Sequence, residues 1–313
     1  MSFNVYDIKN YKIDENYKQS FSNIRNNIDY ITAFEYMIKN YNENIVKEIC
    51  LFLSKFKFAT KKQIIDIIKK KHSIDENFSF ENLLKYNFLK DFILVKGYVD
   101  EVYERNEENT IYAVGPNGIN LLIKRFNINI PVWEFAHISR SGDKVIKCIQ
   151  VVDIYINMLE SFKNYNIIPQ SIGPKQRRSL GDKVDIDFEY TIDDNIKQNF
   201  MILIIRDKDL KEGFNRKISK LEHFICDNGK WRYDYTDVNK RPKIIFVCEN
   251  EDSINLICRK LRGSSLNKDT LVMYTHDKLL KENLITSPIS LKRYIKETNT
   301  LKEYEILNEK EFK

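Results

Sequence analysis

The chain has few cysteines, prolines and glycines, and it has no long apolar run. Its 313 residues include 5 cysteines, 6 prolines and 9 glycines. The cysteines, at positions 50, 148, 226, 248 and 258, are scattered and odd in number, which indicates reduced core thiols. No apolar run is long enough to span a bilayer, and the first residues lack the pattern of a signal peptide. We therefore expect a cytoplasmic protein without a membrane partner.

Several catalytic motifs are also missing from the sequence. It contains no GxxxxGK[ST] phosphate loop and no GxSxG nucleophile turn. The 4 histidines form neither an HxH nor an HxxxH pair, and a relaxase would need a histidine cluster beside its catalytic tyrosine. His223 and Cys226 lie one helical turn apart, but no second pair completes a zinc site. The sequence therefore predicts no cofactor and no bound metal.

The formal net charge is +6, and lysine is much commoner than arginine. This mild basicity suits a nucleic-acid partner without requiring one. The abundance of Asn, Ile, Lys and Tyr is typical of an AT-rich genome, in which lysine is the default residue at exposed positions. A lysine therefore carries less information in this chain than an arginine does.

Residues 60–125 carry the most informative pattern. A preceding helix has one apolar face, formed by Ile45, Ile49, Phe52, Leu53 and Phe56. A second helix begins at a capping box, in which Thr60 and Gln63 satisfy each other's backbone amides. Its predicted buried face is Ile64, Ile65 and Ile68, and a third helix from Ser79 buries Phe80, Leu83, Leu84 and Phe88.

Two strands follow these helices. They are predicted at 93–95 and 111–114, separated by a charged loop at 100–109. The segment 115–118, Gly-Pro-Asn-Gly, ends the second strand. A closing helix has Ile119, Leu122, Ile123 and Phe126 on its apolar face. This order predicts a winged helix-turn-helix, which usually serves to place one helix in a DNA groove. The alternative is a winged helix that binds another protein.

The predicted DNA contacts are basic and polar residues of the second and third helices. They are Lys61, Lys62, Lys69, Lys70, Lys71, Asn82, Lys85, Tyr86 and Asn87. The loop between the strands is acidic, with Asp100, Glu101, Glu104, Glu107 and Glu108 against Arg105, so it is a poor phosphate clamp. A loop at 172–181 adds Lys175, Arg177 and Arg178, either as a phosphate clamp or as an ordinary exposed loop.

The second half of the chain alternates helix and strand. A helix begins near Gly142, and strands are predicted at 184–191, 200–205, 244–248 and 271–274. One further helix buries Phe214, Ile218, Leu221 and Ile225, and another begins at a cap formed by Asn250. The predicted fold class is α+β with two domains: a winged helix-turn-helix, then a three-layer α/β domain. The predicted segments are a helical leader (1–40), a winged helix (41–130), an α/β domain (131–296) and a polar tail (297–313), helical or disordered. The leader is expected to pack on the winged unit or to form a homodimer contact through its apolar residues Phe21, Ile24, Ile28, Ile31 and Phe34.

Three segments resemble the replication-relaxation family of plasmids and other mobile elements. They are residues 110–118, Asp185-Ile-Asp187, and the stretch from Phe200 through 207–217 to Trp231 and 242–247. The resemblance covers roughly residues 44–275. It implies a DNA-binding factor for plasmid replication or relaxation, whose C-terminal domain is similar to the restriction-endonuclease fold.

A nuclease of that fold needs carboxylates on two neighbouring strands to hold Mg²⁺, and a lysine to orient water. Asp185 and Asp187 could supply the first carboxylate, with Asp207 further on, or they simply form the solvated face of an edge strand. Ile205 stands where the family often has a glutamate. These three aspartates are therefore interpreted as a vestigial metal site in a domain without catalytic activity.

The sequence as a whole indicates a non-enzymatic protein that binds specific double-stranded DNA, such as a plasmid origin or its repeats. Its expected role is in the replication or maintenance of a plasmid or other mobile element. The alternatives are a Mg²⁺-dependent nuclease or nicking enzyme, a transcriptional regulator, and an adaptor that binds protein.

Overall fold

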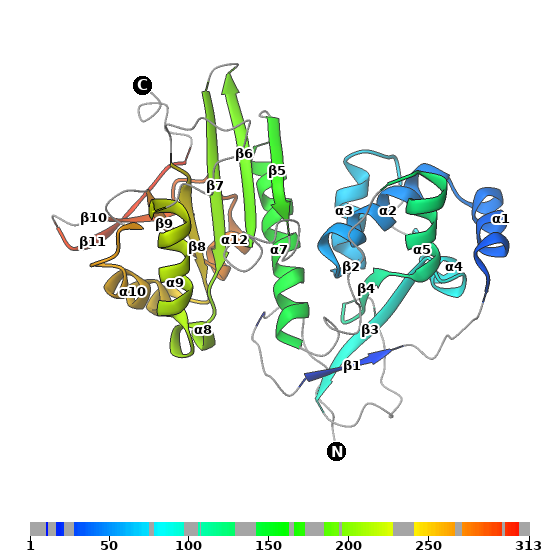
Figure 1. Cartoon of the computed structure of the whole chain (residues 1–313), viewed down its shortest axis with the longest axis horizontal. Coiled ribbons are helices and arrows are strands. Elements are labelled where there is room, and N and C mark those ends of the chain that lie inside the picture. Colours follow the sequence, from blue (N-terminus) through cyan, green and yellow to red (C-terminus); the bar gives the residue numbers. More distant parts are fainter. Residues whose placement is uncertain are drawn as a thin grey trace. The chain divides into compact units, whose positions relative to one another are not determined.

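A computed structural model describes residues 11, 17–21, 28–74, 78–96, 106, 108–128, 142–162, 166–172, 185–193, 196–227, 241–266, 271–295 and 298–306. The fold is mixed α and β with two separate sheets, consistent with the predicted α+β class (Figure 1). The chain forms two compact units, Met1–Ile156 and Asn157–Lys313. Their division falls inside one long helix, α7 (Gly142–Ser161), whereas the sequence suggested a linker near residue 130.

The described residues of the first unit form a series of short elements before α7. They are β1 (Tyr17–Phe21), α1 (Tyr30–Asn40), α2 (Glu43–Phe56), β2 (Ala59–Thr60), α3 (Lys61–Lys69), α4 (Glu81–Lys85), β3 (Leu89–Lys96), β4 (Ile111–Val114), α5 (Pro116–Asn120) and the π-helix η2 (Leu121–Arg125). The sheet order is β1-β3-β4-β2, and every neighbouring pair is antiparallel. The strand β2, only two residues long, joins the edge of the sheet immediately before α3.

Helices cover this sheet. Residues of α7, namely Val145, Ile146 and Ile149, share a buried cluster with Phe58 and Phe92. The helix α2 packs against β4, α3 and α5. Its buried side chains include Ile49, Phe52, Leu53 and Phe56, and those of α3 include Ile64, Ile65 and Ile68. The predicted apolar faces of these two helices are therefore confirmed, except that Ile45 is only half-buried.

The predicted leader helix differs in detail from the structure. Phe21 lies in β1, and α1 begins only at Tyr30, because the Asp29 side chain accepts hydrogen bonds from the amides of Ile31 and Thr32. The buried residues of α1 are Ala33 and Met37, whereas Ile31, predicted to be buried, is 68% exposed.

The closing helix is shifted by its π-turn. A π-turn holds one more residue per turn than an α-turn and so rotates the side chains that follow it. In η2, Leu121 and Leu122 are buried while Ile123, predicted to be buried, is 43% exposed. The helix at Ser79 is also shorter than predicted: α4 is a single turn from Glu81 to Lys85.

The second unit is built on a seven-stranded sheet of order β11-β10-β9-β8-β7-β6-β5. Its strands are β5 (Asn166–Ile172), β6 (Ile186–Asp193), β7 (Ile196–Ile204), β8 (Lys243–Cys248), β9 (Val272–His276), β10 (Lys292–Ile295) and β11 (Thr300–Glu303). The three central strands, β7, β8 and β9, are parallel, and the outer pairs are antiparallel. Phe200 to Ile205 are fully buried, as a doubly covered central strand requires.

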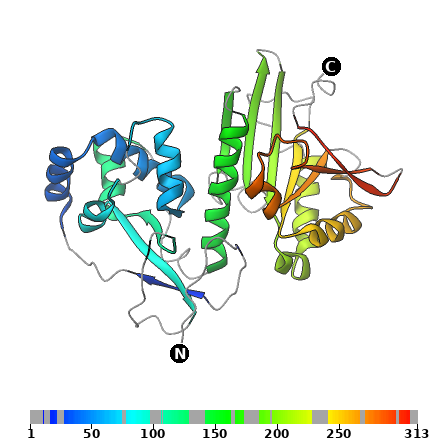
Figure 2. The ribbon, with the colours of Figure 1, turned by 180° about the vertical axis from the view of Figure 1, so that it is seen from behind.

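Helices lie on both faces of this sheet (Figures 1 and 2). One face carries α8 (Asp207–Lys211), α9 (Phe214–Glu222), the π-helix η3 (His223–Asp227) and α10 (Glu251–Lys260). Their core residues include the predicted Phe214, Ile218, Leu221 and Ile225. The other face carries α12 (Asp277–Glu282) and the last turn of α7, where the Asn157 amide donates to the carbonyls of Leu280 and Asn283.

The C-terminal segment is partly a strand. The sequence predicted a polar tail, helical or disordered, from residue 297. Instead β11 pairs with β10, and Leu301 lies opposite Tyr294. Both side chains pack against the core cluster beneath α9 and α10, which explains why this short polar segment joins the sheet.

Candidate functional site

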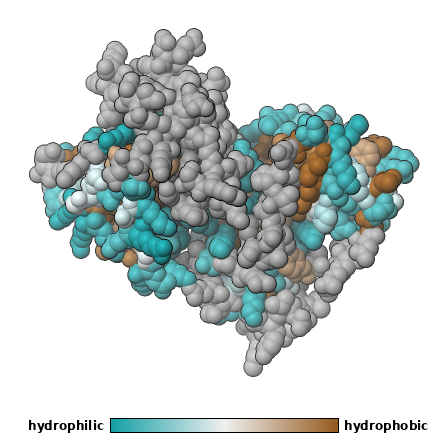
Figure 3. Space-filling view, viewed as in Figure 1, coloured by the Kyte–Doolittle hydropathy of each residue, from teal (hydrophilic) through white to brown (hydrophobic). Residues whose placement is uncertain are grey.

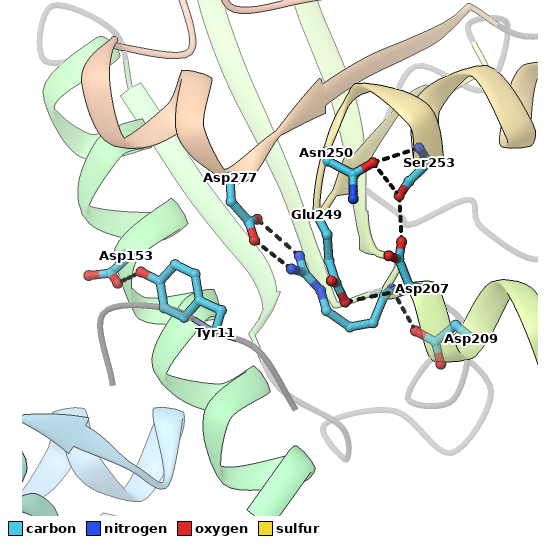
Figure 4. Close-up of polar contacts among 9 residues, drawn as sticks. Tyr11, Asp153, Asp207, Asp209, Glu249, Asn250, Ser253 and Asp277 are labelled. Atoms are coloured by element: carbon cyan, nitrogen blue, oxygen red, sulfur yellow. Dashed lines mark hydrogen bonds and ion pairs between the residues drawn. The ribbon is translucent and has the colours of Figure 1, made fainter. Parts of the chain in front are cut away.

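The first turn of α3 is held in place by hydrogen bonds. Thr60 and Gln63 form the predicted capping box, with the Thr60 amide donating to Gln63 Oε1 at 2.9 Å and the Gln63 amide donating to Thr60 Oγ1 at 3.2 Å. Gln63 also donates from Nε2 to the carbonyl of Ile149 and to Asp153 Oδ1, at 2.9 and 2.7 Å. The Tyr11 hydroxyl donates to the other oxygen of Asp153 (Figure 4). The start of α3 is thus fixed on α7.

Lysines lie at both ends of α3. Lys61 and Lys62 belong to its first turn, Lys69 ends it, and Lys70 and Lys71 follow directly. All are exposed except Lys61, which is half-buried. Lys71 forms a 2.9 Å ion pair with Glu48 of α2. Five of the predicted contact residues therefore lie on α3 or directly after it, and four of them are exposed.

The candidates around α4 have internal contacts. Tyr86 stacks on Tyr36 of α1, with ring centroids 4.0 Å apart and planes 16° from parallel. Asn82 forms a hydrogen bond with Tyr41. Burial raises the pKa of Tyr41, and this hydrogen bond acts in the opposite direction. Asn87 has a left-handed φ of 57°, and its carbonyl accepts the Asn117 amide at 3.0 Å. These aromatic contacts from α1 were not predicted from the sequence, although Tyr36 and Tyr41 stand close together in it.

Lys85 is the exposed basic residue of α4. Its ammonium lies over the Tyr86 ring, 5.7 Å from the ring centroid. Lys175, Arg177 and Arg178, together with most of the acidic loop at 100–109, lie outside the residues that the structure describes.

In the second unit, charged residues gather where the parallel strands end. Arg206 follows β7, Glu249 follows β8 and Asp277 follows β9, so the register of these strands brings them to one edge of the sheet. This edge is where open α/β sheets commonly bind ligands. The Arg206 guanidinium instead forms two hydrogen bonds to Asp277, of 2.5 and 3.0 Å (Figure 4).

The ion pair of Arg206 and Asp277 is buried, with 4% and 13% of the two side chains exposed. Burial alone would lower the pKa of Arg206. The hydrogen bonds to Asp277 and the charge of its carboxylate oppose that effect and hold the pKa above its usual value. The charges of this pair are therefore directed at each other and hold the ends of β7 and β9 together.

The neighbouring carboxylates are also engaged. Asp207 accepts a hydrogen bond from the Ser253 hydroxyl, and its own amide donates to Glu249 Oε1 at 3.1 Å. Asp209 accepts the Arg206 amide at 3.0 Å. Burial raises the pKa of half-buried Glu249, even though the Asp207 amide acts in the other direction. Figure 4 shows Asn250 and Ser253 on the same network, where Asn250 caps α10 as predicted.

Two of the three vestigial metal candidates, Asp185 and Asp207, have described side chains, and both have partners within the protein. Asp185 Oδ2 accepts the Ile204 amide at 2.8 Å and lies 4.0 Å from the Lys217 ammonium. Asp207 contacts Ser253, and the side chain of Asp187 lies outside the described part of the chain. Across the described residues, no group of three or more His, Cys, Asp or Glu side chains is arranged to hold a metal. Ile205 is fully buried in the core beneath α9 and α10.

Comparison with known proteins finds no matching family model, no matching curated protein and no matching solved structure. Within the described ranges, no helix combines the length and the hydrophobicity needed to cross a bilayer. No disulfide joins the five cysteines, all of which lie within the described residues, and those at 50, 248 and 258 are buried.

Proposed function

We propose that this protein binds double-stranded DNA through a winged helix-turn-helix formed by its first unit. The observation that carries the proposal is the order of the elements: α2, β2, α3, α4, β3 and β4. In a winged helix, three helices precede a β-hairpin, and the strand after the first helix completes the sheet. The antiparallel order β3-β4-β2 has that arrangement. Under this proposal α3 and α4 form the helix-turn-helix.

The positions of the charges support a nucleic-acid partner. Lys62, Lys69 and Lys70 are exposed on α3 and at its end, and Lys85 is exposed on α4. Lysines that neutralise phosphates release counterions, which gives a favourable and salt-dependent binding energy. The resemblance to replication-relaxation proteins suggests a plasmid or other mobile element as the source of the DNA, and replication or maintenance as the role.

The same proposal gives the second unit no catalytic activity. Asp185 is occupied by the Ile204 amide and Asp207 by Ser253. Ile205 stands where the family often has a glutamate, and it is fully buried in the core. A carboxylate at this position would therefore not reach a metal in water. A nuclease site on β6 and β7 would require these contacts to be broken.

The test is binding of the full chain to a fluorescent duplex of about 30 base pairs across a salt series. The logarithm of the affinity should fall linearly with the logarithm of salt concentration, with a slope of about −0.9 per neutralised phosphate. Lys62→Ala with Lys69→Ala and Lys70→Ala should make the slope shallower by about 2 to 3 units. Lys144→Ala, an exposed lysine on α7, is the matched control and should change it little. No measurable affinity at about 50 mM salt would refute the proposal.

Specific readout is tested separately on DNA selected by the protein from a random pool. Lys85→Ala and Asn82→Ala should each weaken specific binding by about 1–3 kcal/mol if the side chain contacts a base. Equal losses on selected and random DNA would assign them to the phosphates. Incubation with supercoiled plasmid and Mg²⁺ should leave the plasmid intact. Cleavage that disappears in Asp185→Ala would make the nuclease alternative correct.

A further inference from the structure

The outer face of α9 and the C-terminal half of α10 is basic. Arg216 and Lys220 are exposed and four residues apart, so they project from the same side of α9. Arg259, Lys260 and Arg262 are exposed at the end of α10. Three of these five are arginines in a chain where lysine is much the commoner base, so lysine-rich composition does not explain them.

The acidic residues of the same helical layer do not neutralise this face. Asp207 and Glu249 belong to the network at the strand ends, and Glu251 pairs with Lys292 of β10. The Glu222 carboxylate accepts hydrogen bonds from Ser264 and Ser265. Glu212 and Asp252 are the remaining acids that are exposed on α10 or beside α9. Of the residues that the structure describes, none forms an ion pair with Arg216, Lys220 or Arg259.

The two basic helices are held beside each other by specific contacts. The Lys260 ammonium donates to the Leu210 carbonyl at 3.1 Å and lies 5.5 Å from the centroid of the Phe214 ring. Glu222, at the end of α9, accepts the Ser264 hydroxyl at 2.6 Å, just after α10. Figure 1 shows α9 and α10 on the same side of the sheet. The positive charges are therefore presented by a fixed surface.

We propose that this face binds the sugar-phosphate backbone of a nucleic acid. The inference rests on the proposed function and adds a second contact surface to it. Arginine matches the geometry of phosphate through its planar set of donors. The exposed polar residues between the charges, Asn215, Ser219 and Asn255, also suit phosphate and sugar contacts. Because backbone contacts carry no direct sequence information, binding at this face is independent of base sequence.

The experiment uses the full chain with Arg216→Ala, Lys220→Ala and Arg259→Ala combined. Each lost phosphate contact should make the salt slope shallower by about 0.9 and weaken binding at about 0.1 M salt by roughly tenfold. The loss should be the same on selected and random duplexes. The matched control combines Lys278→Ala and Lys281→Ala of α12 with Lys302→Ala of β11, all exposed lysines of the second unit. Thermal unfolding of both triple variants shows whether the fold is retained.

The possible results separate the two proposals. If the unaltered chain binds no duplex, the proposed function itself has failed. If the unaltered chain binds, and the α3 lysine variant loses affinity while the arginine variant keeps the original slope, only the inference about α9 and α10 is overturned. That face would then belong to an acidic partner of another class, such as a protein. A slope reduced by both triple variants alike would also overturn it, because the effect would reflect total charge.

Discussion

The two units use their charged residues in different ways. In the first, the lysines in and directly after α3 are exposed except half-buried Lys61, and Lys71 forms an ion pair with Glu48 in which 61% of the lysine side chain is exposed. In the second, Arg206 and Asp277 are buried against each other at the ends of parallel strands. Charged side chains therefore lie at the surface in one unit and connect strands in the other. Burial decides between these uses, because a charge withdrawn from water needs a partner within the protein.

Glycines of the two units also differ in the space around them. In the first unit, Gly115 and Gly118 sit against the backbone of Asn87 and Phe88, and the Gly115 amide donates to the Phe88 carbonyl at 2.8 Å. In the second, a Cβ atom added at Gly263 would meet no atom within 4 Å. The helix after β4 is thus attached to the turn after α4 through glycines, which suits a small unit with short strands.

The largest effect should come from breaking the buried ion pair of the second unit. Arg206→Ala would leave the Asp277 carboxylate buried without its partner and should lower the free energy of unfolding by about 3–5 kcal/mol. Lys71→Ala, which breaks the exposed pair of the first unit, should cost less than about 1 kcal/mol. Urea denaturation measures both. Arg206→Met combined with Asp277→Leu removes both charges and should recover most of the loss. Equal losses from Arg206→Ala and Lys71→Ala would remove the distinction between the units.

An intermediate effect is expected at the close approach in the first unit. A Cβ atom at Gly118 would lie 2.4 Å from the Phe88 carbonyl oxygen and 3.0 Å from Cys50 Sγ. Gly118→Ala should therefore destabilise the protein by about 1–3 kcal/mol, through displacement of a backbone that cannot yield easily. Gly263→Ala is the control and should change stability little. Amide hydrogen exchange should show the loss of protection in α5 and β4; loss confined to the second unit would contradict the prediction.

The smallest effect concerns pH. Burial raises the pKa of Glu249, so the folded protein binds this proton more readily than the unfolded chain does. Stability from this group is therefore lost as the pH rises from the unfolded pKa through the raised folded pKa. In Glu249→Gln the amide oxygen can still accept the Asp207 amide. The stability of this variant relative to the unaltered protein should rise as the pH increases above about 4.3, the usual pKa of glutamate. A pH-independent difference in urea denaturation would contradict this assignment.

Much of the fold was predictable because its causes are local. The caps at Thr60 and Asn250 depend on residues three positions away, and both were predicted. The apolar faces of α2, α3 and α9 follow from helical spacing, and the buried run from Phe200 to Ile205 identifies a central strand. The strands β1, β5, β10 and β11 were not predicted. Three of them, β1, β5 and β11, lie at sheet edges, and β10 lies between β9 and β11, so all four depend on pairing with other strands.

The candidate sites were less predictable than the elements that carry them. Helical spacing placed Asn82 and Tyr86 on a polar face. It gave no sign that Tyr36 of α1, or Tyr41 directly after α1, would contact them. The π-turn in η2 moved Ile123 to the surface, and α-helical spacing cannot anticipate that change.

The sequence by itself determined the caps that begin α3 and α10, the apolar faces of α2, α3 and α9, and the buried central strand β7. Only the tertiary structure decided which polar residues remain available to a partner. Arg206 and Asp277 are 71 residues apart, and they meet because β7, β8 and β9 run parallel in register. Arg216 and Arg259 come to one face because α9 and α10 cover the same side of that sheet. Spacing along the chain governs contacts within one element, whereas charges on different elements meet only through the packing that joins them.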